Sequence, residues 1–140
     1  MAGQKAKPPK KKSSWLASRS RPDRSPSAPA AGKIVHVTDK TFRDLVLQAD
    51  VPVLVDFWAD WSAPCRAMAP GLEELASQYA GLARVAQMNI DKNRVIPARY
   101  DIKTLPTVLV FKGGEILQTF IGAPSKGELS KVIAWAMREE

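Results

Sequence analysis

The stretch "VPVLVDFWADWSAPCRAMAPGLEELASQYA", residues 51–80, joins an apolar run to a segment with helical spacing. Its first part, residues 51–59, is almost unbroken in apolar residues, which is typical of a strand that is covered on both faces. In the second part, apolar residues recur on one helical face: Cys65, Met68, Leu72, Leu75 and Tyr79. A buried strand that runs directly into an amphipathic helix predicts an α/β fold.

The elements on either side continue this alternation. From apolar periodicity we expect strands at 33–37, 51–59, 82–91, 106–112 and 115–122, and helices at 38–49, 62–80, 93–101 and 125–140. Gly113 and Gly114 form a two-residue hairpin turn between the last two strands. Parallel crossovers followed by a hairpin predict a mixed central β-sheet with helices on both faces.

Local signals mark where the helices begin. Thr38 or Asp39 can cap the helix expected at 38–49, and Ser125 with Glu128 has the spacing of a capping box. Pro64 suits a first helical position. Pro70 lies further inside the same helix and should kink it, because proline removes a backbone donor and crowds the preceding turn.

The net charge of +7 lies in the N-terminal quarter of the chain. Residues 1–33 hold nine lysines and arginines against one aspartate, whereas residues 34–140 hold twelve basic and thirteen acidic residues. The first segment also has five of the eleven prolines and few large apolar residues. It cannot bury enough apolar surface to offset its ordering entropy. We therefore expect a disordered basic tail at residues 1–32 and one folded domain at residues 33–140.

Three interpretations of the tail are open. It can be a solvated extension, the usual role of a charge run, or it can weakly contact acidic surfaces or nucleic acid through its charge. Its Ser/Arg-rich, acid-poor composition is also that of an organelle transit peptide. The sequence has no apolar run that could span a membrane and no secretory signal.

A single cysteine limits the chemistry of the chain. Cys65 has no partner for an intramolecular disulfide, and a lone cysteine with the lone His36 cannot build a zinc site. We therefore expect no metal and no cofactor. The absence of a disulfide gives no sign of an oxidising compartment. A cytoplasmic location is expected, with an organelle as the alternative if the tail is a transit peptide.

Several motifs in a fixed order resemble the thioredoxin family. They are "VLVDFWADW", "PCRAMAP", "NIDKN", "LPTVLVFKGGE" and "IGAPSKGEL", and the match covers roughly three quarters of the chain, from about residue 33 to the end. The resemblance implies a thioredoxin-like fold, a monomer and membership of the thiol–disulfide oxidoreductase class. It also implies thioredoxin reductase or glutathione as redox partners.

The resemblance breaks at the position of the attacking cysteine. Where the family has W-C-G-P-C, this chain has "WSAPC", so that Ser62 replaces the first cysteine, Ala63 replaces the glycine and Cys65 is the resolving cysteine. A serine hydroxyl is almost never ionised at neutral pH and cannot form a disulfide, so exchange cannot begin. We expect dithiol reductase activity to be absent or very low. Natural divergence and a laboratory substitution are both open as the origin of Ser62, and Ala63 with Gln87 favours divergence.

A second family feature is a buried carboxylate. Asp56 lies inside the apolar strand, at the position where the resemblance implies a proton acceptor for the resolving cysteine. The lysine that usually attends it is replaced by Gln87. Burial disfavours the charged form of a carboxyl group, and the loss of a nearby cation adds to this effect. The sequence predicts that the pKa of Asp56 is raised.

The resemblance also implies a shallow groove that binds extended segments of client proteins. Pro106 matches the family's cis-proline, whose preceding residue keeps its backbone groups free to pair with a peptide. The groove is expected to include Trp61, Ala63, Pro64, Thr104, Leu105, Pro106, Gly122 and Ala123.

Two classes of function remain open. In the first, the chain is a member of the oxidoreductase class in which only Cys65 could react, as a monothiol that accepts glutathione or a client sulfur; an inert structural thiol is the other interpretation of Cys65. In the second, the chain is a redox-independent, chaperone-like or assembly module that binds clients in the groove.

Overall fold

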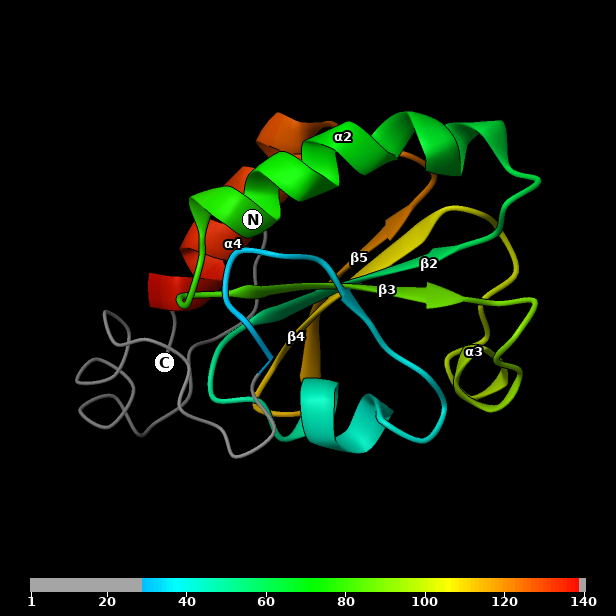
Figure 1. The fold of residues 1–140 in the computed structure, drawn as a ribbon, viewed down its shortest axis with the longest axis horizontal. Helices are drawn as coiled ribbons and strands as arrows, with labels where there is room; N and C mark the ends of the chain where they lie inside the picture. The colour runs from blue at the N-terminus through cyan, green and yellow to red at the C-terminus, as the bar shows by residue number, and fades with distance from the viewer. Residues whose placement is uncertain (1–28, 139–140) are drawn as a thin grey trace.

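The computed structural model describes residues 29–138, which build around a five-stranded mixed sheet (Figure 1). The strand order is β1–β3–β2–β4–β5. β1, β3 and β2 are parallel, whereas β4 runs antiparallel to β2 and β5 antiparallel to β4. The strands are β1 (Val35–His36), β2 (Val53–Trp58), β3 (Arg84–Asn89), β4 (Thr107–Lys112) and β5 (Glu115–Ile121). The predicted mixed sheet is confirmed, and the predictions for residues 1–28 lie outside the described residues.

Helices cover both faces of the sheet, as the sequence predicts (Figure 1). One face packs against α2 (Ala63–Gln78) and α4 (Lys126–Arg138), and its core includes Leu72, Leu75, Leu129 and Ile133. The other face packs against η1 (Arg43–Leu47) and α3 (Val95–Arg99). There Phe42, Tyr100 and Phe111 form a trio with ring centroids 5.6–5.8 Å apart. Each large apolar side chain buried in these layers contributes about 1.5–3 kcal/mol before the cost of ordering it.

β2 is the central strand and supplies both cores. Its residues 53–57 are buried, and alternate side chains point to opposite layers. Leu54 belongs to the layer under α2 and α4, so Asp56, two residues on, faces the same layer. The register places Asp56 beside Gln87 of β3 and Val108 of β4. Asp56 therefore lies at the centre of the sheet, under the helix that carries Cys65.

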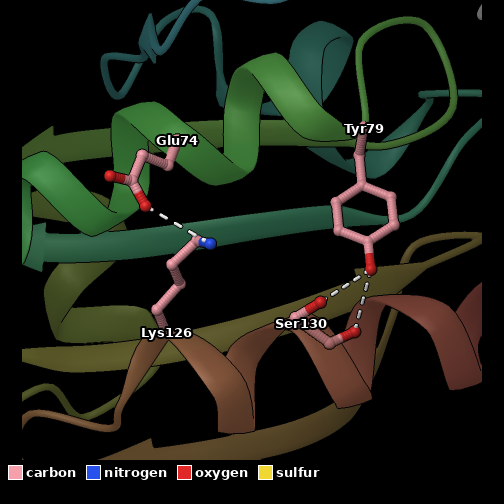
Figure 2. A network of polar contacts seen from close by, with 4 residues as sticks. All are labelled: Glu74, Tyr79, Lys126 and Ser130. Atoms are coloured by element: carbon pink, nitrogen blue, oxygen red, sulfur yellow. Dashed lines mark hydrogen bonds and ion pairs between the residues drawn. The ribbon is translucent and has the colours of Figure 1, made fainter.

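Polar contacts join α4 to Glu74 in the C-terminal half of α2 and to Tyr79, which directly follows α2 (Figure 2). Lys126 Nζ lies 3.3 Å from Glu74 Oε1, and the Tyr79 hydroxyl lies 2.7 Å from Ser130 Oγ and 3.3 Å from the Ser130 carbonyl oxygen. The exposed ion pair contributes little, at most about 1 kcal/mol. The half-buried Tyr79 contact fixes the position of the two helices more firmly, because its polar atoms have little access to water.

The helix expected at 38–49 is shorter than predicted and irregular. Thr38 caps its start, as predicted: Thr38 and Thr41 exchange backbone-to-hydroxyl bonds of 2.9 and 3.2 Å, the reciprocal pattern of a capping box, and the N–H of Phe42 bonds to the carbonyl of Thr38 at 2.9 Å. Only η1 follows, and the N–H of Gln48 reaches back five residues to the carbonyl of Arg43. The expected length of this helix is therefore wrong.

Asp39 caps a different helix from the expected one. Its carboxylate accepts the backbone N–H groups of Arg94, Val95 and Ile96 at 2.9–3.1 Å, at the start of α3. Asn93 completes the junction, because its side-chain oxygen accepts the N–H of Asp39 at 2.9 Å. The loop after β1 is thereby joined to α3. A side-chain cap of this kind stabilises a helix by about 1 kcal/mol.

The predicted start signals of α4 and α2 agree more closely with the structure. Ser125 and Glu128 form the predicted capping box at α4, with reciprocal bonds of 2.9 and 3.1 Å. In α2, Ala63 is the first helical residue and Pro64 the second, one position later than expected. The helix continues through Pro70 to Gln78.

Candidate functional site

The candidate site lies where β2 ends and α2 begins. The chain turns there through residues 59–62, held by a 3.1 Å bond from the N–H of Ser62 to the carbonyl of Ala59. This turn leaves Trp61 67 % exposed. Its indole Nε1 donates to Asp91 Oδ2 at 3.1 Å, which fixes the ring against the loop after β3. Trp61 is thus a positioned surface side chain, as the groove prediction requires.

Ser62 caps α2 instead of facing solvent. The resemblance places an exposed cysteine here, but Ser62 is 5 % exposed. Its hydroxyl oxygen accepts the backbone N–H of Cys65 at 3.4 Å, a long hydrogen bond at the start of the helix. Serine is a preferred capping residue because its short side chain satisfies a free helical N–H. The hydroxyl is therefore directed at the backbone of its own helix.

Cys65 lies on the buried side of α2 and is 3 % exposed. This agrees with the apolar periodicity of the helix, which predicts Cys65 on the core-facing side. The hydrogen bond between these two residues joins the Ser62 hydroxyl to the backbone nitrogen of Cys65. Within residues 29–138 the Ser62 hydroxyl has no hydrogen bond to the Cys65 sulfur. A reagent in solvent thus meets Ala63 and Pro64, which are both exposed, before it meets the thiol.

Asp56 is fully buried, and one of its two carboxylate oxygens has a hydrogen-bond partner in residues 29–138. Its Oδ2 accepts a 3.1 Å hydrogen bond from Gln87 Nε2, while its Oδ1 has no hydrogen-bond partner within residues 29–138. Burial raises the pKa of Asp56 from 3.8 to about 6, and the Gln87 bond opposes the rise only in part. The predicted direction of the pKa shift is confirmed. Asp56 changes its charge close to neutral pH.

The opposite side of the site consists of two loops held together by one backbone bond. The Leu105–Pro106 peptide bond is cis, as the resemblance implies, and the Thr107 hydroxyl donates to the carbonyl of Thr104 at 2.6 Å. The N–H of Gly122 donates to the carbonyl of Pro106 at 2.9 Å, which joins the loop before β4 to the end of β5.

Gly122 has a backbone conformation that favours glycine. Its φ is +99°, and a Cβ built on it would meet no atom within 4 Å. The space in front of Gly122 is therefore open, and the next residue, Ala123, is exposed. An incoming backbone could approach this corner closely.

The structure brings the predicted site residues to one end of the sheet in two sets. Ser62, Ala63, Pro64 and Cys65 share the first turn of α2, with Trp61 before it, and Leu105, Pro106 and Gly122 form the second set. Sequence reasoning missed Asp91, which bonds to Trp61, and Ile121, which is 70 % exposed. Ile121 could have been found, since an isoleucine directly before Gly122 lies at the expected groove.

Neither a metal-binding cluster nor a membrane-spanning helix occurs within residues 29–138. Among these residues no three histidine, cysteine, aspartate or glutamate side chains gather where they could hold a metal ion. None of the helices in this part of the chain combines the length and the apolar character that a bilayer span needs. The chemical groups of the site are thus a hydroxyl, a buried thiol and a buried carboxyl group.

Comparison with known proteins gives one consistent family. A family model described as thioredoxin matches residues 33–135. A thioredoxin of Haemophilus influenzae is 39 % identical over 101 residues, which cover 72 % of this chain and 94 % of that protein. Thioredoxin 1 of a Nostoc species is 46 % identical over 97 residues, with 69 % and 91 % covered. A thioredoxin of Acidithiobacillus ferridurans is 48 % identical over 97 residues, with 69 % and 90 % covered. A family of disulfide oxidoreductases therefore accounts for both the sequence and the fold, and the chain belongs to the thioredoxin family.

Proposed function

We propose that this chain is a thioredoxin-family protein that binds extended protein clients in the groove but does not turn over as a dithiol reductase. The single observation that supports the loss of turnover is the first turn of α2. It presents the Ser62 hydroxyl as a helix cap and places the thiol of Cys65 behind it, 3 % exposed. Exchange requires a thiolate that reaches a client disulfide, and neither group provides one.

Within the oxidoreductase class, the alternative to a loss of all redox activity is a monothiol reaction at Cys65. A glutathione or client sulfur would have to pass the exposed Ala63 and Pro64 to reach the buried Cys65. We expect Cys65 in the native chain to react with iodoacetamide at least about 100-fold more slowly than in the unfolded chain, because alkylation needs an exposed thiolate. Mass spectrometry of native and urea-unfolded protein measures both rates. Native alkylation as fast as in the unfolded chain would establish a reactive monothiol.

The second part of the proposal is client binding without redox chemistry, as in a chaperone-like or assembly module. Trp61, directly before Ser62, is 67 % exposed, and Ile121, directly before Gly122, is 70 % exposed. Exposed large apolar residues at a site with open backbone are typical of surfaces that bind protein segments. The expected clients are extended protein segments with apolar side chains. The basic tail could add weak contacts to acidic surfaces or nucleic acid through its charge.

The binding role predicts which substitutions weaken it. Trp61→Ala should lower the affinity for a permanently unfolded, carboxymethylated protein by about tenfold, because a large aromatic anchor is lost from the interface. Calorimetric titration or fluorescence anisotropy measures the affinity. Lys131→Ala, an exposed change on α4, is the matched control and should leave the affinity unchanged. Cys65→Ala should leave it unchanged as well; a large loss with that variant would show that binding depends on the thiol.

A further inference from the structure

An apolar cleft lies on the sheet face that β4 and β5 form, with the exposed Ile121 in its lining. The loop 100–104 and strands β4 and β5 enclose a space of about 270 Å³. In its lining Thr107 and Leu109 are buried, at 2 % and 3 % exposed, whereas Ile116 and Ile121 are 42 % and 70 % exposed. The exposed apolar side chains of this lining, Ile116 and Ile121, therefore lie near the two ends of β5. We call this space the β5 cleft.

The β5 cleft adjoins an open sheet edge. β5 is the last strand in the order, and within residues 29–138 only β4 pairs with it. No residue of β5 belongs to the core under η1 and α3, so these helices leave its face uncovered. An exposed edge strand with apolar side chains is a ready acceptor for an additional chain segment.

The sequence outside the described residues supplies one matching segment. In residues 1–28, Trp15 and Leu16 are adjacent, and apart from Met1 they are the only large apolar residues. Asp101 and Lys103 beside the cleft neutralise each other in an ion pair of 3.4 Å. The charges at the cleft thus give no special attraction to a basic segment. Apolar burial is the driving force that the cleft offers.

The chain between these residues and the domain is long enough. Residues 17–28 separate Leu16 from Pro29, and a chain of this length spans up to about 43 Å. Pro29 lies with Gly81 and Ala83 near the start of β3. β3 and β5 are three strand spacings apart, about 14 Å, and a six-residue strand is about 20 Å long. The linker can therefore pass around the sheet to the β5 cleft.

We propose that Trp15 and Leu16 bind in the β5 cleft of their own chain. This goes beyond the proposed client binding and does not depend on it. A segment on the same chain has an effective concentration in the millimolar range, so that even a weak apolar contact is substantially occupied. A client whose side chains enter the β5 cleft from the neighbouring groove then competes with this segment.

The test uses the full chain with labelled isoleucine methyl groups. Ile116 and Ile121 are five residues apart on β5, so we expect nuclear Overhauser effects between the Trp15 ring and the methyl groups of one of the two, and their disappearance in Trp15→Ala/Leu16→Ala. Amide exchange along β5 should become about tenfold faster in that variant, because the segment no longer protects the edge. The double variant Ser13→Ala/Ser14→Ala is the matched control and should behave like the unchanged chain.

Three further measurements decide between the occupants. Nuclear Overhauser effects that persist on dilution support an intramolecular occupant, whereas their disappearance on dilution would assign the cleft to a second copy and overturn the proposal. Nuclear Overhauser effects that persist in 0.5 M salt support apolar burial. If these effects disappear in 0.5 M salt, they come from the charge of the tail, and the proposal is overturned as well. Identical methyl spectra and exchange rates with and without Trp15 and Leu16 would overturn the proposal outright.

Discussion

Ser62→Cys is expected to give this chain dithiol reductase activity. A thiol at residue 62 occupies the N-cap of α2, where the free helical N–H groups and the helix dipole stabilise a thiolate. Cys65 then lies three residues further along the first turn of the same helix, in the position of a resolving thiol. We expect turnover at least about 100-fold above that of the unchanged chain, since exchange proceeds through a thiolate that serine cannot provide.

Insulin reduction with dithiothreitol measures this activity. The matched controls are Ser62→Ala, which adds no sulfur, and Ser62→Cys combined with Cys65→Ser, which has an attacking thiol but no resolving one. Both should remain without turnover. An unchanged chain that already reduces insulin at rates typical of its relatives would contradict the loss of activity. An inactive Ser62→Cys protein with native structure would show that Ala63 and Gln87 have altered the site further.

Asp56→Asn should stabilise the folded chain above neutral pH. The pKa of Asp56 rises from 3.8 to about 6 because burial disfavours its charged form. Relative to an uncharged residue, the buried carboxylate therefore lowers the free energy of unfolding by about 3 kcal/mol once the pH is well above 6. Asparagine has nearly the same shape and can still accept the hydrogen bond of Gln87.

The sign of the pH dependence follows from the raised pKa. The protonated carboxyl group is tolerated in the folded chain, so its favourable contribution is complete below pH 3.8 and is lost as the pH rises through about 6. Urea unfolding at pH 4 and at pH 8 should therefore show a small difference in stability between the unchanged chain and the Asp56→Asn variant at the lower pH and a large one at the higher. Asp50→Asn, at an exposed carboxylate, is the control. A difference that does not change with pH would contradict the assignment to Asp56.

The central strand and helix were predictable because their signals are local and strong. The unbroken apolar run indicated β2, and the apolar periodicity of α2 placed Cys65 in the core. The segment 38–49 shows the limit of this reasoning. Its apolar spacing is helical and Thr38 caps its start, but the helix is a short π-helix, and Asp39 binds the start of α3 more than fifty residues away. Periodicity contains no information on such distant partners.

The same distinction applies to the site. The family motifs predicted which residues belong to the site, and the apolar neighbours of Asp56 predicted that it is buried. The orientation of Ser62 did not follow, because a residue at the start of a helix can face solvent or turn its side chain to the backbone. The bond between Trp61 and Asp91 also depends on two segments that only the fold brings together. Contacts between distant segments are the part that a single sequence does not reveal.

The contacts of Tyr79 and Glu74 with α4 have a consequence for how such a protein can diverge. Glu74 lies in the C-terminal half of α2 and Tyr79 directly follows its last residue, well away from the first turn, where the chemistry of the family resides. Changes at the active end of this helix therefore leave its anchorage intact. A protein lineage can in this way lose a reaction and retain a stable fold, which can then take on another function.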